Sequence, residues 1–194
     1  MLLKLGAIQI HNGFQFSLNK LDLSGTENAP VAVQDVRRFR NLRVLSLSRL
    51  SQQILSVEDF LEFGTDLEEL KITFGHLQII KNNAFKHVHG LKKLQLSDNK
   101  INNIENNAFV DISHSLVSLK LFHAFSSSVQ NFPTEAIKTL SNLEELDISN
   151  NEIKNMPDTS FHFLKKLKRL SIQDNIIEIV YKGTFQVIIN FMLI

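Results

Sequence analysis

Residues 91–109 read LKKLQLSDNKINNIENNAF, and most of the fold can be predicted from this one stretch. It opens as L-x-x-L-x-L, in which alternate apolar residues are typical of a short strand with one buried face. Asn99 follows, then Ile101 and Ile104, and then Phe109, which lies 18 positions after the first leucine. One such unit cannot bury its own apolar face, so it must stack against neighbouring units.

The same unit recurs along the chain. The L-x-x-L-x-L opening starts at Leu18, Leu42, Leu67, Leu91, Leu116, Leu143 and Leu167. Successive starts are 24 to 27 residues apart, within the roughly 20–29-residue period of leucine-rich repeats. The sequence therefore predicts an α/β repeat fold, namely an uncapped leucine-rich-repeat solenoid of about seven repeats with a curved parallel β-sheet on its concave face.

These starts also set the expected boundaries. We expect residues 18–186 to form the repeats. Residues 1–17 fit the period poorly, although Leu5, Ile8 and Ile10 resemble a strand, so we expect this segment to be the remainder of an upstream repeat. We expect residues 187–194 to be a truncated apolar tail.

Two further positions keep the register of the repeat. One predicts a buried aromatic spine, with a large apolar residue in each unit: Val36, Phe60, Phe85, Phe109, Ile137, Phe161 and Phe185. The other predicts a ladder of buried amides that bond backbone groups of the turns, at Asn99, Asn151 and Asn175. Other residues hold that position elsewhere, so we expect a broken ladder and irregular turns at Thr26, Leu50, Gly75 and Ala124.

The fifth unit is three residues longer than the 24-residue units, and the excess falls in or just after residues 122–128, FHAFSSS. We interpret this as a length variation in which Phe122 and Phe125 pack onto the core. The alternative is an exposed bulge that binds a partner.

Composition narrows the classes of function. The formal net charge is +1, from 21 basic and 20 acidic residues, which offers no electrostatic case for nucleic acid. There is no cysteine, so these residues can form neither a disulfide nor a thiolate metal site. Neither end has the features of a signal peptide or a membrane span, so we expect targeting and attachment to depend on parts outside this segment.

The solvent-facing positions of the predicted sheet form the candidate binding surface. Its residues alternate in charge from strand to strand: Glu68, Glu69, Lys92, Lys93, Lys120, Glu144, Glu145, Asp147, Lys168 and Arg169. Stacked strands lie about 4.8 Å apart, so acidic and basic pairs become neighbours twice along the sheet. They can serve as a patterned surface for a partner, or as an intramolecular ladder of exposed ion pairs, and the two readings are compatible.

We find no pattern that predicts catalysis, a cofactor or a small-molecule substrate. Ser/His/Asp sets, glycine-rich phosphate loops and H-E-x-x-H do not occur in a supporting context, so we expect a protein that is not an enzyme. His87, His89 and His114 lie close in the predicted stack, but no acidic residue repeats their register. We interpret them as exposed polar residues rather than metal ligands.

Beyond the generic repeat, several stretches resemble a family of insect photoreceptor cell-adhesion proteins of the extracellular leucine-rich-repeat type. The resemblance extends from about Leu18 to Gln186 and is carried by residues 56–64, 83–91, 113–119, 158–165 and 181–186, many of them at non-core positions. It implies cell–cell or microvillar adhesion at the outer surface of the plasma membrane. The partner that it implies is another protein, and that protein can be a second copy of the chain. It implies no catalytic or metal residue.

Two other functions remain open at this point. The chain can be part of the ectodomain of a Toll-type signalling receptor, which shares the repeat. It can also be a repeat region of an intracellular adaptor, which the lack of cysteine favours and the resemblance opposes.

Overall fold

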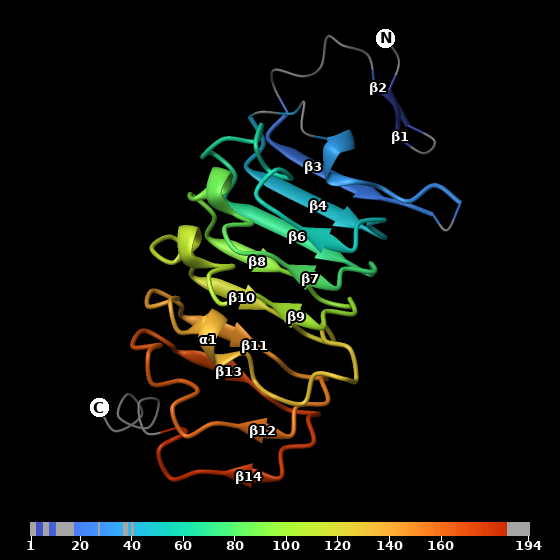
Figure 1. Cartoon of the computed structure of the whole chain (residues 1–194). Coiled ribbons are helices and arrows are strands. Elements are labelled where there is room, and N and C mark those ends of the chain that lie inside the picture. Colours follow the sequence, from blue (N-terminus) through green and yellow to red (C-terminus); the bar gives the residue numbers. More distant parts are fainter. Residues whose placement is uncertain are drawn as a thin grey trace.

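The computed structural model describes residues 3–5, 8–10, 18–26, 28–36, 39 and 41–185. One strand from each predicted repeat joins a seven-stranded sheet, and neighbours in sequence are neighbours in space (Figure 1). All six pairings in this sheet are parallel. Its strands are β3 (Lys20–Ser24), β4 (Val44–Ser48), β6 (Glu69–Thr73), β8 (Lys93–Gln95), β10 (Ser118–Lys120), β11 (Glu145–Asp147) and β13 (Arg169–Ser171).

Shorter strands form the opposite face of the solenoid. They are β5 (Ile54–Leu55), β7 (Ile79–Ile80), β9 (Asn103–Ile104), β12 (Asn155–Met156) and β14 (Ile179–Val180). Single turns of helix complete several coils, as η2 (Val33–Asp35), η3 (Lys86–Val88), η4 (Val110–Ile112) and α1 (Thr134–Ile137). The predicted leucine-rich-repeat solenoid is confirmed, with the longer sheet on its concave face.

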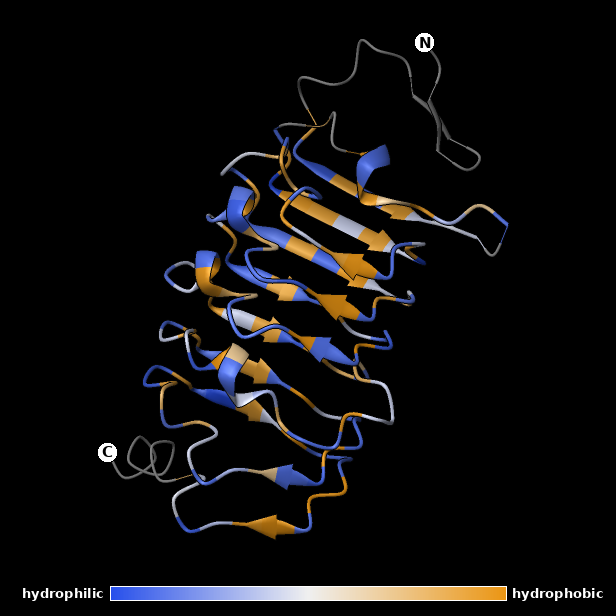
Figure 2. Cartoon of the chain, in the orientation of Figure 1, coloured by the Kyte–Doolittle hydropathy of each residue, from blue (hydrophilic) through white to orange (hydrophobic). Residues whose placement is uncertain are grey.

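The register of the concave sheet follows from the leucines. Leu45, Leu70 and Leu94 lie opposite one another on adjacent strands, and each is buried. In β6 the burial alternates residue by residue, as a strand with one buried face requires. Figure 2 shows the same alternation of hydrophobic and hydrophilic residues along the strands. The apolar side chains of all the repeats thereby merge into one continuous core.

The predicted phenylalanine spine is confirmed as an aromatic stack inside this core. The ring centroids of Phe60 and Phe85 are 5.7 Å apart, and those of Phe85 and Phe109 are 5.8 Å apart. The rings of Phe161 and Phe185 are stacked at 5.6 Å. These separations lie in the range that aromatic pairs prefer.

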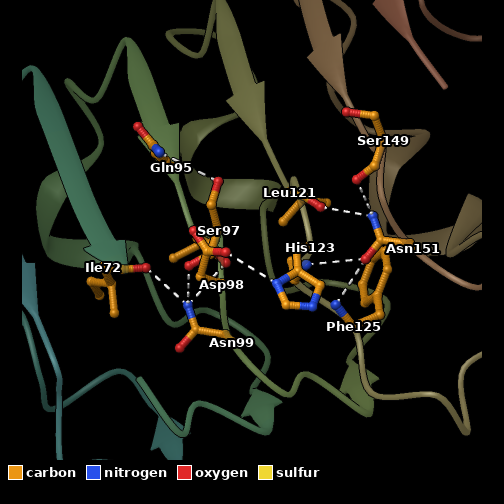
Figure 3. Close-up of polar contacts among 12 residues, drawn as sticks. Ile72, Gln95, Ser97, Asp98, Asn99, Leu121, His123, Phe125, Ser149 and Asn151 are labelled. Carbon is orange, nitrogen blue, oxygen red and sulfur yellow. Dashed lines mark hydrogen bonds and ion pairs between the residues drawn. The ribbon is translucent and has the colours of Figure 1, made fainter. Parts of the chain in front are cut away.

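The asparagine ladder is also confirmed. Asn151 donates from Nδ2 to the carbonyl oxygens of Leu121, Ile148 and Ser149 at 2.8–3.0 Å. Its Oδ1 accepts the backbone N–H groups of Ala124 and Phe125 at 3.0 and 2.9 Å. Each ladder asparagine therefore bonds its own turn and the turn of the preceding repeat, as the sticks of Figure 3 show for Asn99 and Asn151.

The expected irregularity at Leu50, Gly75 and Ala124 is wrong. The residue just before the ladder position has a positive φ of 46–58° in six consecutive repeats, at Arg49, Phe74, Asp98, His123, Asn150 and Asp174. The turns therefore share one conformation whether or not an asparagine follows. Backbone bonds between stacked turns explain this, because Gly75 N–H donates to Asp98 O and Asp98 N–H to Phe122 O. At Thr26 the turn does differ, since Thr26 and Ala29 pair as an antiparallel bridge.

The insertion of the fifth repeat falls just after Phe125, because Phe125 still pairs with Ile101 and Asn131 pairs with Asn155. The prediction for its two aromatics is half right. Phe125 is buried, whereas Phe122 is 37% exposed. Ile137 is fully buried at its predicted place, and the ring of Phe132, which the sequence reading missed, lies 5.2 Å from that of Phe161.

At the N-terminal end, β1 (Leu3–Leu5) and β2 (Ile8–Ile10) form a separate two-stranded sheet. The two strands pair with each other, antiparallel, and so do not follow the parallel register of the repeats. That residues 1–17 are the remainder of a repeat stays a prediction. The predicted apolar tail, residues 187–194, lies outside the described residues. In the part of the chain that the structure describes, no helix has the length and apolar character needed to cross a membrane.

Candidate functional site

The concave sheet presents its charged side chains in bands, one band for each strand. The residue before each strand and the alternate residues within it face solvent, because the leucines between them point into the core. Parallel pairing then places equivalent residues side by side: Glu69 lies opposite Lys93, and Glu145 lies opposite Arg169. The predicted meeting of acidic and basic pairs is therefore confirmed at both places.

The first acidic band lies at β6. Glu68 Oε1 is 3.1 Å from Lys92 Nζ and 3.8 Å from Arg43 NH2. Its neighbour Glu69 is 3.0 Å from Lys71 Nζ and 3.7 Å from Lys93 Nζ. The hydrogen bond from Lys92 lowers the pKa of Glu68, and the hydrogen bond from Lys71 lowers the pKa of Glu69. Both carboxylates thus stay ionised at neutral pH.

The second acidic band lies at β11. Glu144 Oε2 is 3.0 Å from Lys168 Nζ. Glu145 is 3.5 Å from Lys120 Nζ and 3.5 Å from Arg169 NH2, and it accepts a 2.8 Å hydrogen bond from the Ser118 hydroxyl. That hydrogen bond is the largest cause that lowers the pKa of Glu145, with the charges of Lys120 and Arg169 adding to it.

Between the two acidic bands, the two positions after the first leucine of the fifth repeat are uncharged. Val117 and Ser118 hold these positions, and Val117 is 37% exposed. Because Ser118 is short, the sheet has a hollow of about 180 Å³ here, whose polar lining comes from Glu69, Lys71, Lys93, Gln95, Ser118, Lys120 and Glu145. The hollow carries both signs of charge, as a protein-binding surface with alternating bands requires.

All ten predicted site residues lie on this sheet or at its edge, and nine belong to the ion-paired bands. Asp147 is the exception, because its Oδ1 accepts bonds from the backbone N–H and the hydroxyl of Ser149. The predicted site residues leave out Arg43, Lys71 and Ser118, which also contact the acidic bands. Lys71 holds the same register position as Lys120 and Asp147, so a full reading of that position would have found it.

The site consists of fixed charges that neutralise one another at the surface. Such pairs contribute little to folding, about 0–1 kcal/mol each, because water screens them. Among the described residues, no group of three or more histidine, aspartate or glutamate side chains is arranged to hold a metal ion. What this arrangement can do is recognise a charged and patterned protein surface.

Comparisons with known proteins agree with the fold and with the resemblance. Chaoptin of Drosophila melanogaster is 52% identical over 120 residues, which cover 60% of this chain and 9% of that protein. Chaoptin of Tribolium castaneum is 64% identical over 78 residues, 40% of this chain and 10% of that protein. The chain thus spans about a tenth of the length of these relatives. These matches confirm the resemblance.

A solved structure, the TLR13–ssRNA13 complex, superimposes with a TM-score of 0.77 at 22% identity and covers 89% of this chain and 24% of that one. At this identity the likeness shows the fold alone. The family model described as the BspA type leucine rich repeat region matches six copies over residues 55–190, well over half of the chain. With seven parallel strands in the same register, the chain belongs to the leucine-rich-repeat family.

Proposed function

We propose that this chain is a protein-binding segment of a chaoptin-like adhesion protein at the cell surface, which mediates cell–cell or microvillar contact in photoreceptors. The observation that carries the proposal is the identity of 52% and 64% with two chaoptins. Repeat packing dictates the leucines, but it leaves the exposed positions free. Identity at this level extends beyond the core and therefore favours a shared surface and partner.

The concave sheet is the contact surface that we assign to this function. Its bands alternate in sign, with acidic residues at β6 and β11 and basic residues at β8 and β13. Alternating charge favours one register with a protein partner and disfavours others. A nucleic acid has a single sign of charge and needs a basic stripe, which these bands do not form.

A Toll-type receptor ectodomain is the alternative. The likeness to the TLR13 complex is one of fold, at 22% identity, whereas the chaoptins match at 52% and 64%. The difference favours adhesion over signalling.

Adhesion can be tested by display. Non-adhesive cells that carry the chain on a membrane anchor should cluster with one another or bind isolated photoreceptor membranes. Matched cells that display an unrelated leucine-rich-repeat segment at the same density are the control. Equal behaviour of the two cell populations in both assays would contradict the proposed function.

A further inference from the structure

The turns that follow the concave strands stack into a rim along one edge of the solenoid. We call the turn rim the six residues with positive φ that hold equivalent positions in successive repeats: Arg49, Phe74, Asp98, His123, Asn150 and Asp174. Backbone bonds join these turns in order, among them Arg49 N–H to Thr73 O and His123 N–H to Ser149 O. The rim is separate from the concave charge bands, because it lies where the strands end.

Phe74 is unfavourable at this place in two ways. Its φ is 54°, a left-handed conformation that asparagine and aspartate adopt more readily than a bulky aromatic residue. Its side chain is also 62% exposed, which makes it the most exposed large hydrophobic residue among those described. Other repeats place polar residues in the same turn, such as Asp98, Asn150 and Asp174. An outlier that folding does not need points to a role in binding.

A second aromatic residue and a polar pair accompany Phe74. Phe122 lies two repeats farther on, directly before the rim residue His123, in the turn that follows β10. Its side chain is 37% exposed, and its ring lies 6.4 Å from the imidazole of His123. The Nδ1 atom of His123 lies 3.0 Å from Asp98 Oδ1, in the repeat between the two phenylalanines (Figure 3). Exposed aromatic side chains beside a polar pair are typical of the residues that dominate protein interfaces.

The order of residues along the rim is self-complementary. A two-fold axis normal to the sheet, between β8 and β10, would bring the rim of a second copy against this one with the repeats in reverse order. Arg49 then faces Asp174 of the other copy, and Asp98 faces the other His123. Phe74 faces Asn150, and Phe122 faces Ser97, so each aromatic ring meets a smaller side chain. A self-contact of this symmetry requires such a match at every position.

We propose that the turn rim binds a second copy of this chain, with the two solenoids antiparallel and edge to edge. This inference rests on the proposed adhesive function and adds to the concave sheet a second contact surface with a defined register. Phe74 and Phe122 anchor the contact, and Arg49 with Asp174 sets its register.

The anchors are tested with residues that the chain itself uses at equivalent positions. Phe74→Asn copies Asn150, and Phe122→Ser copies Ser97 and Ser149. We expect the dimer dissociation constant of the purified chain, measured by sedimentation velocity, to rise at least about tenfold in the double variant. The melting temperature should stay level or rise, because asparagine adopts a positive φ with less strain. A loss of association with unchanged stability separates a binding role from a structural one.

The register is tested by exchanging charges. Arg49→Asp and Asp174→Arg should each weaken the dimer, and the double exchange should restore it. Within one chain these residues lie five strands apart, roughly 24 Å at about 4.8 Å per strand. That distance exceeds the screening length of about 8 Å at physiological salt, so a rescue must arise between copies.

The rim contact would be overturned if the wild-type chain stays monomeric at 100 micromolar. It would also be overturned if the anchor and exchange variants leave the dissociation constant unchanged. Dimerisation with neither clustering of displaying cells nor binding to photoreceptor membranes would instead contradict the adhesive function and leave the rim contact intact. Clustering that persists in the rim variants would contradict the rim contact and leave the adhesive function intact.

Discussion

At the scale of single residues, the polar side chains that matter most to folding are those that complete the backbone bonding of the turns. Asn151 is 6% exposed and bonds five backbone groups in two repeats. A buried N–H group without a partner is costly, so this amide stabilises the stack out of proportion to its size. Ser118 has a similar place on the surface side, where its hydroxyl holds the Glu145 carboxylate.

Replacing Asn151 by alanine should lower the free energy of unfolding by about 2–4 kcal/mol, because the N–H groups of Ala124 and Phe125 lose their acceptor. Urea unfolding of the purified chain measures the loss. Asn155→Ala is the matched control, since Asn155 is exposed and its side-chain Nδ2 donates to Asn131 Oδ1, another exposed amide. Equal losses in the two variants would show that the buried ladder carries no special weight.

The Ser118 hydroxyl should also control an ionisation. The pKa of Glu145 is lowered in the folded chain, so its contribution to stability is present above its ordinary value of 4.5 and is lost as pH falls through the folded pKa. Ser118→Ala removes the largest cause, and the pKa of Glu145 should rise toward 4.5 in an NMR titration. The titration of Glu68, which Lys92 holds, should not move. If the pKa of Glu145 does not change, then Lys120 and Arg169, and not Ser118, lower it.

At the scale of the repeat, large side chains at one register position determine how neighbouring coils pack. Phe85 and Phe109 are fully buried and stack ring on ring, so each coil supports the next. The fifth repeat keeps this continuity despite its insertion, because Ile137 holds the spine position and Phe132 contacts Phe161. Stability in such an array is shared between neighbours.

Phe109→Ala should therefore destabilise the chain by roughly 3–5 kcal/mol, since it opens a cavity in the middle of the stack. Hydrogen exchange should rise in strands β6 and β7 of the third repeat and β10 of the fifth, and not only in the fourth repeat, which carries the mutation. Val110→Ala is the control one residue away, where the side chain is 37% exposed and a change within about 0.5 kcal/mol is expected. A loss confined to the fourth repeat would contradict the coupling between coils.

Much of this level could be predicted from the sequence, because packing forces the apolar positions to repeat. The strands, the spine and the ladder all follow from the spacing of Leu91, Asn99 and Phe109. The regular turn at Gly75 could not be predicted from a missing asparagine, because backbone bonds to Asp98 hold it. The sequence also could not predict that Phe122 is exposed while Phe125 is buried. That difference depends on the point at which the extra residues are inserted into the coil. The charge bands were predictable from register, whereas the hydrogen bond from the Ser149 hydroxyl to Asp147 was not.

At the scale of the molecule, stacking turns short sequence patterns into continuous surfaces. Pairs such as Glu144-Glu145 and Lys168-Arg169 become bands across the concave sheet, while the turns line up as a rim. Neither surface is needed for folding, since exposed ion pairs add little stability and Phe74 is strained. We therefore assign the fold to the leucines and phenylalanines, and the proposed adhesive contact to the residues that packing leaves free.

Clustering of cells that display the chain, with the charge of one band reversed, tests this claim most directly. The double variant Glu144→Lys with Glu145→Lys places like charges beside Lys168 and Arg169 and removes one acidic band from the surface that a partner would contact. The control, Glu135→Lys with Glu152→Lys, changes the net charge equally at exposed positions off the concave sheet. Both proteins should be displayed equally and melt alike.

We expect the band reversal to reduce clustering several-fold at low salt and the control to leave clustering unchanged. The difference should shrink as salt rises, because exposed charges are screened within about 10 Å at roughly 0.1 M. Equal clustering of wild type, reversal and control at low salt would contradict the account and leave the bands as a solvated ladder of ion pairs.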